Sequence, residues 1–448
     1  MARAPDAQKG EKVEPGMNAK NGKLAIVVAG GPAPGINSVI GAVTIRACLS
    51  DVEVVGIQEG FRWLMEGDTS RVAPLTIADT SRIHFRGGSC IGISRANPTK
   101  KPEHMTNVLR TLAGLGVTML VTIGGDDTCF TAYKLGQASG GALRVVHVPK
   151  TIDNDLDLPH DVWTFGYQTA RAVGVEIVAN LMVDAKTTGR WYFVVAMGRK
   201  AGHLALGIGK AAGATLTLIP EEFGEKGTRL KTIVDSLAGA ILKRRAAGRV
   251  DGVVVLAEGL AESVLQEDLA ELHTAERDDH GNLRLDEISF GDIVKTRVRA
   301  RLVELGVKGT TIVAKNIGYE LRCADPIPFD MEYTRDLGYC AAQYIMDGGT
   351  NALVSIQQGR FKPIPFEHIM SPETGRMRIR MVDVGSDRYR IAYAYMLRLA
   401  RSDFDDPVEL ASLAAAAGTT PERIRAELQY LVEGAAPAAA VEGNATVS

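Results

Sequence analysis

The sequence predicts an α/β protein with mainly parallel sheets. Short apolar segments of strand length alternate with amphipathic helical segments over about 350 of the 448 residues. Some of the apolar segments, such as 24–29, contain no polar residue, as expected for parallel strands buried on both faces. Two of the segments run into a glycine pair, Gly30-Gly31 or Gly124-Gly125, with a helix following. Since ligands bind at the carboxyl ends of strands in such sheets, we expect the site to be formed by these loops.

Apolar runs and helical spacing place the elements along the chain. The expected strands cover residues 24–29, 52–57, 117–121, 143–148, 191–196, 214–219, 253–256, 310–314 and 352–356. The expected helices cover residues 39–49, 61–66, 106–114, 168–185, 228–245, 292–304 and 336–346, with one more starting at Thr128. A charged helical segment is expected at 391–435, between a disordered tail at 1–22 and a flexible tail at 436–448.

Composition excludes several classes of protein. The 51 basic and 53 acidic residues nearly balance, which argues against a nucleic-acid or membrane-surface partner. The five cysteines are scattered without CxxC spacing, which argues against a structural zinc site and suits a reducing compartment. We find no secretory signal and no apolar run long enough to cross a membrane. A cytoplasmic protein is expected.

Two acidic loops carry the chemistry. Residues 122–128 follow a buried strand, and their two glycines leave backbone N–H groups directed at an anion. Asp126 and Asp127 would repel that anion unless a divalent cation lies between them. Residues 149–155 follow the next strand and supply a lysine and three acidic or amide side chains. The combination indicates phosphoryl transfer. The alternatives are that Asp126 and Asp127 cap a helix and that the second loop is merely solvated.

The motifs in these loops resemble those of the 6-phosphofructokinase family. In the family's order the chain has Gly30-Gly31 with Asn37, 124–127 (GGDD), 151–155 (TIDND), 197–199 (MGR), Glu258-Gly259 and 318–322 (GYELR). The resemblance covers residues from about 23 to about 390. It implies two Rossmann-like three-layer domains with the active site between them. It places a phosphoryl-donor domain at 23–165 plus about 325–390, and a sugar-phosphate domain at 166–324.

Two positions resemble the pyrophosphate-dependent branch of this family. ATP-using members have a glycine in place of Asp127 and another in place of Lys150. A carboxylate at Asp127 would occupy the space that the α-phosphate of ATP requires. Lys150 would place a cation beside the transferred group, where pyrophosphate has no adenosine to anchor it.

The resemblance also implies roles for single residues. Asp126 resembles the Mg²⁺ ligand, and Asp153 resembles the general base that accepts the proton of the sugar 1-hydroxyl. Arg190 resembles an arginine that reaches the sugar 6-phosphate of a neighbouring subunit, so a homodimer or a higher homo-oligomer is expected. Asp127, Lys150 and Arg199 complete the expected catalytic set. The remaining residues expected to bind substrate are Gly31, Arg95, Thr151, Asp155, Met197, Gly198, Glu258, Tyr319 and Arg322.

The sequence therefore predicts an enzyme that transfers a phosphoryl group from pyrophosphate to the 1-hydroxyl of fructose 6-phosphate, with Mg²⁺. The nearest alternative is an ATP-dependent 6-phosphofructokinase. Lipid and nicotinamide-nucleotide kinases also have a GGDG-type loop, but they lack the TIDND and MGR strings. A catalytically silent regulatory subunit would need neither Asp153 nor Arg199.

Overall fold

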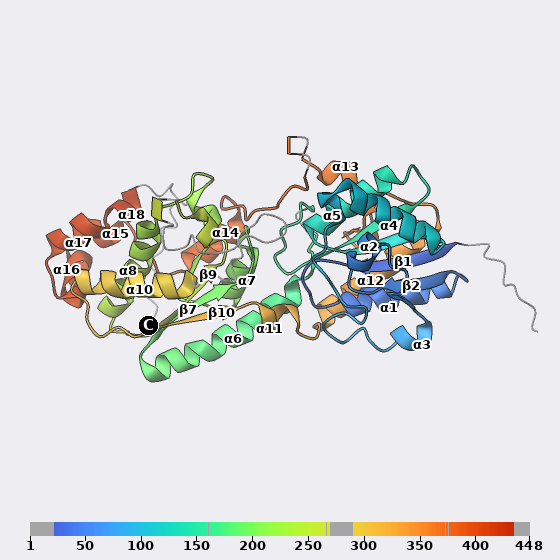
Figure 1. Ribbon diagram of the computed structural model, residues 1–448. Coiled ribbons are helices and arrows are strands. Elements are labelled where there is room, and N and C mark those ends of the chain that lie inside the picture. Colours follow the sequence, from blue (N-terminus) through green and yellow to red (C-terminus); the bar gives the residue numbers. More distant parts are fainter. Residues whose placement is uncertain are drawn as a thin grey trace, which may run out of the picture.

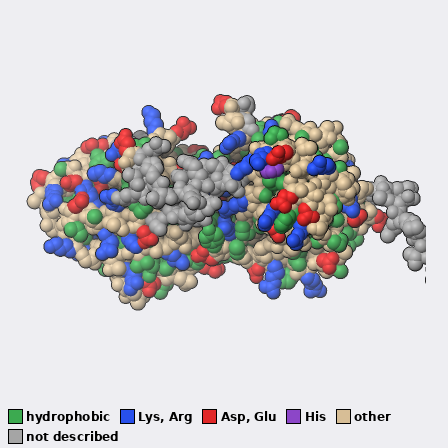
Figure 2. Space-filling view, viewed as in Figure 1, with side chains coloured by type: hydrophobic (Ala, Val, Ile, Leu, Met, Phe, Trp, Pro, Cys, Tyr) green, Lys and Arg blue, Asp and Glu red, His purple; other side chains and the backbone are tan. Residues whose placement is uncertain are grey.

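The computed structural model describes residues 22–159, 161–265, 267–268, 290–371, 373–374 and 376–433. The tails expected at 1–22 and 436–448 lie outside these residues, apart from residue 22, as do the last two residues of the segment expected at 391–435. Within the described part of the chain, no helix combines the length and the apolar character needed to cross a membrane. The face shown in Figure 2 carries basic and acidic side chains interspersed, as the near-zero net charge suggests.

The larger sheet has eight strands, in the order β14-β11-β5-β4-β1-β2-β3, with β6 paired to β5. Only β3 and β14, at its two edges, are antiparallel to their neighbours. The strands are β1 (Lys23–Val28), β2 (Glu53–Ile57), β3 (Val72–Pro74), β4 (Val117–Gly124), β5 (Arg144–Thr151), β6 (Phe165–Gly166), β11 (Ala352–Leu353) and β14 (Ile364–Pro365). β12 (Ile356–Gln357) and β13 (Arg360–Phe361) form a separate hairpin.

Helices cover both faces of this sheet, because alternate residues of each strand point to opposite sides. Leu24 and Ile26 of β1 pack with α1 and α12, whereas Ala25 and Val27 pack with α2, α4 and α5. The helices are α1 (Ile36–Cys48), α2 (Arg62–Glu66), α3 (Ile77–Thr80), η1 (Pro98–Lys100), α4 (Pro102–Gly114), α5 (Asp126–Ala138), α12 (Pro328–Met346) and α13 (Phe366–Ile369).

The pairing of α1 with α12 is the closest helix contact of this half. A Cβ atom at Gly338 would lie 2.7 Å from the Ala42 Cβ and 2.8 Å from the Val39 carbonyl oxygen. Glycine is therefore required where the two backbones meet. The apolar faces that this contact buries come from segments nearly 300 residues apart, as the blue and orange helices in Figure 1 show.

The smaller sheet is entirely parallel, in the order β10-β7-β9-β8. Its strands are β7 (Trp191–Ala196), β8 (Leu216–Leu218), β9 (Gly252–Ala257) and β10 (Ile312–Ile317). α6 and α7 pack together and against β9, while α10 packs with α8 and against β7 and β10. The helices are α6 (Tyr167–Thr188), α7 (His203–Ala212), η2 (Pro220–Phe223), α8 (Leu230–Ala246), α9 (Leu260–Ser263), α10 (Phe290–Glu304) and α11 (Tyr319–Arg322).

The chain passes between the two halves three times, as the colours in Figure 1 show. It leaves the larger sheet through β6 and α6, returns from α11 into α12, and crosses again after α13. The expected α/β class with mainly parallel sheets is confirmed. The last crossing leads to α14 (Asp387–Ala394), α15 (Ser402–Asp405), α16 (Pro407–Ala417), α17 (Pro421–Leu428) and α18 (Tyr430–Glu433).

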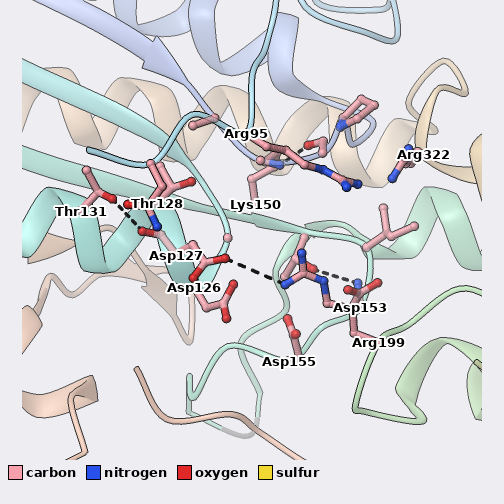
Figure 3. Close-up of a pocket in the computed structure, with 18 of the residues that line it drawn as sticks. Arg95, Asp126, Asp127, Thr128, Thr131, Lys150, Asp153, Asp155, Arg199 and Arg322 are labelled. Atoms are coloured by element: carbon pink, nitrogen blue, oxygen red, sulfur yellow. Dashed lines mark hydrogen bonds and ion pairs between the residues drawn. The ribbon is translucent and has the colours of Figure 1, made fainter. Parts of the chain in front are cut away.

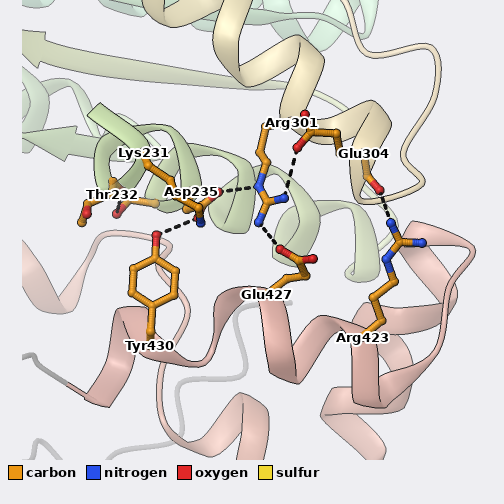
Figure 4. Close-up of polar contacts among 9 residues, drawn as sticks. Lys231, Thr232, Asp235, Arg301, Glu304, Arg423, Glu427 and Tyr430 are labelled. Carbon is orange, nitrogen blue, oxygen red and sulfur yellow. Dashed lines mark hydrogen bonds and ion pairs between the residues drawn. The ribbon is translucent and has the colours of Figure 1, made fainter. Parts of the chain in front are cut away.

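A buried carboxylate ties these last helices to the smaller half (Figure 4). Asp235 of α8 is fully buried and accepts hydrogen bonds from Arg301 Nε at 2.6 Å and from the Tyr430 hydroxyl at 2.7 Å. Arg301 also donates to Glu427 at 2.7 Å. Since a buried ion pair is stable only when its polar atoms are satisfied, the network fixes α17 and α18 on α8 and α10.

Candidate active site

Loops that follow parallel strands of both sheets meet at a cavity between the two halves (Figure 3). Most of the site residues expected from the sequence line it. They are Gly31, Arg95, Asp126, Asp127, Lys150, Thr151, Asp153, Asp155, Met197, Arg199, Glu258 and Arg322.

The turn between β4 and α5 places two carboxylates at the edge of the cavity. The backbone folds tightly there, because a Cβ atom at Gly124 would lie 2.3 Å from the Thr128 Cβ. Asp126 and Asp127 occupy the first turn of α5, where the positive end of the helix dipole stabilises negative charge. Asp127 Oδ2 lies 4.0 Å from Arg199 Nη1, so the turn is linked to the opposite half of the molecule.

A histidine inside the sheet holds this turn in place. His147 is fully buried on β5, where burial lowers its pKa to about 3, so the ring is neutral. Its Nε2 lies 3.0 Å from the Gly124 carbonyl and its Nδ1 lies 2.9 Å from the Thr122 hydroxyl. Nε2 therefore donates to the carbonyl and Nδ1 accepts from the hydroxyl. Nothing in the local sequence marks His147, and we did not predict it.

Five carboxylates, three guanidinium groups and one ammonium group line the cavity. Burial raises the pKa of Asp153, and burial together with Asp153 raises the pKa of Asp155 to about 8. Arg199 opposes both shifts. Burial alone would lower the pKa of Arg199, but Asp126 and the other acids raise it above its ordinary value. Arg199 therefore stays charged and favours the ionised forms of Asp153 and Asp155.

Lys150 reaches across the cavity from the end of β5. Its side chain is buried, and its ammonium donates a hydrogen bond to the Gly31 carbonyl. Burial lowers its pKa to about 7, although Asp153 acts in the opposite direction. The lysine is therefore a cation that water stabilises poorly and that an anionic ligand would stabilise well.

A family model described as phosphofructokinase matches residues 23–345. The chain belongs to the phosphofructokinase family. A pyrophosphate–fructose 6-phosphate 1-phosphotransferase of Thermotoga maritima is 51% identical to it over 416 residues, which cover 92% of this chain and 99% of that protein. A protein of the same name from Naegleria fowleri is 46% identical over 419 residues, covering 92% of this chain and 96% of that protein.

Solved structures of the phosphofructokinase family have the same fold. The pyrophosphate-dependent phosphofructokinase of Nitrosospira multiformis superposes with a TM-score of 0.64 at 17% identity, covering 85% of this chain and 93% of that one. The enzyme of Marinobacter aquaeolei gives 0.61 at 16% identity, covering 92% of each chain. The family and the fold predicted from the motifs are confirmed.

Three expected site residues of this phosphofructokinase do not line the cavity. Gly198 lies next to it, where its N–H and that of Arg199 donate to Glu258 at 3.2 and 3.3 Å. Arg199 itself has a left-handed backbone, with φ at 42°. Tyr319 is 55% exposed, and the Arg322 guanidinium lies over its ring at 4.5 Å. The third residue, Arg190, precedes β7 at the opposite end of that strand from the cavity.

Asparagine 37 supports the glycine-rich loop that leads to Arg95. Its Nδ2 donates to the Arg86 and Gly87 carbonyls at 3.2 and 3.1 Å, and its Oδ1 accepts from Cys90 N at 2.8 Å. Asn37 is buried in the first turn of α1, next to the buried Ser38 and ahead of the apolar Val39 and Ile40. An amide buried in this way needs partners, so its position in an apolar helix is a signal that sequence reasoning could use.

Proposed function

We propose that this phosphofructokinase transfers a phosphoryl group from pyrophosphate to the 1-hydroxyl of fructose 6-phosphate, with Asp153 as the general base. One observation carries the proposal. Asp153 Oδ1 is buried at the cavity and has no hydrogen-bond partner among the described residues. A buried carboxylate oxygen normally has a partner. A sugar hydroxyl would supply one, and the oxygen would accept its proton as the new P–O bond forms.

The cations around Asp153 support this role. A base must be ionised before it can accept a proton, yet burial favours the neutral acid. Arg199 and Lys150 offset that effect. They also face the space that the transferred group would occupy, where positioning and charge stabilisation dominate because the transition state is loose. Arg322, whose Nη1 lies 3.8 Å from the Met197 sulfur, is proposed to bind the sugar 6-phosphate.

Asp127 and Lys150 support pyrophosphate as the donor. The Asp127 carboxylate lies 4.0 Å from Arg199, and on this proposal it would occupy the space that the α-phosphate of ATP requires. The Lys150 ammonium beside Gly31 supplies a cation for a donor that has no nucleoside. The relatives named above, at 46–51% identity, are named for pyrophosphate as well.

The carboxylates of the cavity also suit a magnesium ion. Among the described residues, no three His, Cys, Asp or Glu side chains form a ready-made metal site. Magnesium suits such a site, because it commonly uses one or two carboxylates together with phosphate oxygens and water. Asp126 would hold the ion. When bound, magnesium would neutralise charge on the phosphate oxygens.

We propose a homo-oligomer, and the position of Arg190 supports this proposal. Arg190 and Arg199 lie beyond opposite ends of β7, whose six residues span roughly 20 Å at about 3.3 Å per residue, so we expect that one sugar does not contact both from the same chain. Within its own chain Arg190 Nε lies 3.8 Å from Asp184 Oδ2. We propose that it binds the sugar 6-phosphate of a neighbouring subunit. A cytoplasmic location is proposed as well, supported by five unpaired cysteines.

The decisive assay compares donors on the purified protein. Phosphate release from pyrophosphate should require both fructose 6-phosphate and Mg²⁺, and an excess of ATP should not replace pyrophosphate. Because a phosphoanhydride and a phosphoester are closer in energy here than in the ATP reaction, the reverse reaction should also be measurable. Activity with ATP exceeding that with pyrophosphate would contradict the proposal.

A further inference from the structure

A short segment near the end of the chain, residues 376–382, runs between the two halves; we name it the strap. Ile379 forms an antiparallel bridge with Leu156, and the Arg380 N–H donates to the Asp155 carbonyl at 2.7 Å. On its other side the Arg380 carbonyl accepts from His203 Nε2 at 3.1 Å. The strap therefore contacts the acidic loop that carries Asp153 and also the first residue of α7.

A second contact fixes the strap to the smaller half. Glu221 Oε1 accepts hydrogen bonds from Val382 N at 2.9 Å and from Gly202 N at 2.8 Å. Gly202 is the N-cap of α7, three residues after Arg199. The backbone of the strap is thus anchored to the same turn that presents Arg199 to the cavity.

The Arg380 side chain clamps the acidic loop. Its Nε and Nη2 lie 3.2 and 3.1 Å from the Asn154 carbonyl, and Nη2 also donates to Asn154 Oδ1. Its Nη1 lies 3.2, 3.3 and 2.9 Å from the carbonyls of Leu158, Pro159 and Val162. A guanidinium has five N–H donors in a rigid plane, so this one side chain can donate to the carbonyls of several residues at once.

Asn154 is the residue on which this clamp acts most directly. It lies between Asp153 and Asp155, is buried, and has a left-handed backbone with φ at 56°. A left-handed conformation is costly for a residue other than glycine and persists only where its surroundings impose it. Arg380 bonds both the backbone carbonyl and the side chain of Asn154. The clamp therefore fixes the residue that follows Asp153.

We propose that Arg380 is a positioning residue that holds Asp153 in the geometry required for proton transfer. Arg380 donates hydrogen bonds to the Asn154 carbonyl and therefore acts on Asp153 through the backbone of its neighbour. It lies beyond the region that matches the phosphofructokinase family model, which ends at residue 345. The proposal rests on the role of Asp153 given above and assigns a function to the C-terminal part of the chain.

The test compares Arg380→Ala with Arg378→Ala in the full-length protein. Arg378 is the matched control, because it belongs to the same strap and pairs with Asp157 at 2.8 Å, yet its side chain is 48% exposed. We expect Arg380→Ala to lower kcat about 100-fold relative to the wild type. The KM values for pyrophosphate and fructose 6-phosphate should stay within about threefold, because displacing the base slows the reaction without weakening substrate binding. Arg378→Ala should keep kcat within about twofold of the wild type.

Two further measurements separate positioning from simple loss of fold. Millimolar guanidinium should raise kcat of Arg380→Ala at least about tenfold and leave Arg378→Ala unchanged, because it can refill the donor site. Arg380→Lys keeps the charge but not the planar fork, so its kcat should stay at least about tenfold below the wild type. If Arg380→Ala does not fold, the kcat of Arg380→Lys relative to the wild type tests the proposal instead.

The proposal is overturned if a folded Arg380→Ala protein, or Arg380→Lys, keeps kcat within about threefold of the wild type. Loss of rate without rescue by guanidinium would likewise assign Arg380 to stability alone. Hydrogen exchange of residues 152–159 gives a readout that needs no activity: it should become faster in Arg380→Ala and not in Arg378→Ala. A wild-type protein inactive with pyrophosphate would refute the proposed function, while the exchange comparison would still decide whether the clamp exists.

Discussion

Replacing Lys150 by methionine should stabilise the protein without ligand, by an amount that depends on pH. The lysine is 3% exposed, and burial lowers its pKa from 10.5 to about 7. The pKa of Lys150 is thus lower in the folded protein than in the unfolded chain. Above about pH 10.5 the lysine is neutral in both states and does not destabilise the fold. As the pH falls from about 10.5 to about 7, the unfolded chain binds the proton more readily, so the free energy of unfolding decreases. Methionine has a similar length and does not titrate.

The magnitude follows from the two pKa values. At about 1.36 kcal/mol for each pH unit, the interval from 10.5 to about 7 corresponds to about 5 kcal/mol. Lys150→Met should therefore match the wild type near pH 10.5 and exceed its free energy of unfolding by about 5 kcal/mol at pH 7 and below. Tyrosines that titrate in this range are shared by both proteins and cancel in the difference.

Urea unfolding at several pH values between 7 and 10.5 measures this difference. Lys200→Met is the control, because Lys200 is exposed and lies only one residue beyond Arg199. The control should differ from the wild type by the same small amount at every pH. A difference between Lys150→Met and the wild type that does not change with pH would refute the reasoning, since it would show that water reaches the ammonium group.

Three other predictions concern the reaction. Asp127→Gly combined with Lys150→Gly should weaken pyrophosphate use sharply and admit some activity with ATP, which a donor-competition assay would detect; unchanged donor preference would contradict the assigned roles. Asp153→Asn should lower kcat by roughly 10²–10⁴-fold with a modest change in sugar-phosphate affinity, and near-normal kcat would rule out Asp153 as the base. Mixing Asp153→Asn chains with Arg190→Ala chains should restore one complete site in each hybrid dimer and approach half of wild-type activity. No recovery in verified hybrids would show that the sites are not shared.

The strands and the loops of the site could be predicted because their signals are local. Trp191–Ala196 is a strand in the structure with the same bounds as expected, since a short run of apolar residues between polar ends determines it. The same holds for the glycine turn before Asp126. The helix expected at 336–346 was predicted only in part. It ends where expected, but α12 begins at Pro328, eight residues earlier.

Tertiary contacts explain what local patterns could not show. The first turns of α12 lack an apolar period because Asp330 is buried there and accepts hydrogen bonds from Gly166 N and Thr169 N, at 2.9 and 2.8 Å. The role of Arg380 could not be predicted for the same reason, because it too depends on tertiary contacts. Its carbonyl partners lie more than 200 residues earlier in the chain, and nothing in the sequence distinguishes Arg380 from Arg376 and Arg378, with which it alternates among apolar residues.

The contact between α1 and α12 has a consequence for synthesis of the chain. α1 ends at Cys48 and α12 begins at Pro328, so 280 residues separate the two helices. At a translation rate of roughly 5–20 residues per second, the ribosome needs about 15–60 seconds to reach the second helix. Throughout this time Val39, Ile40 and Val43 have no partner helix, and the smaller half is incomplete as well, because α14 to α18 follow α12 in the chain. The nascent larger half therefore exposes an apolar helix face to which chaperones could bind until α12 has been made.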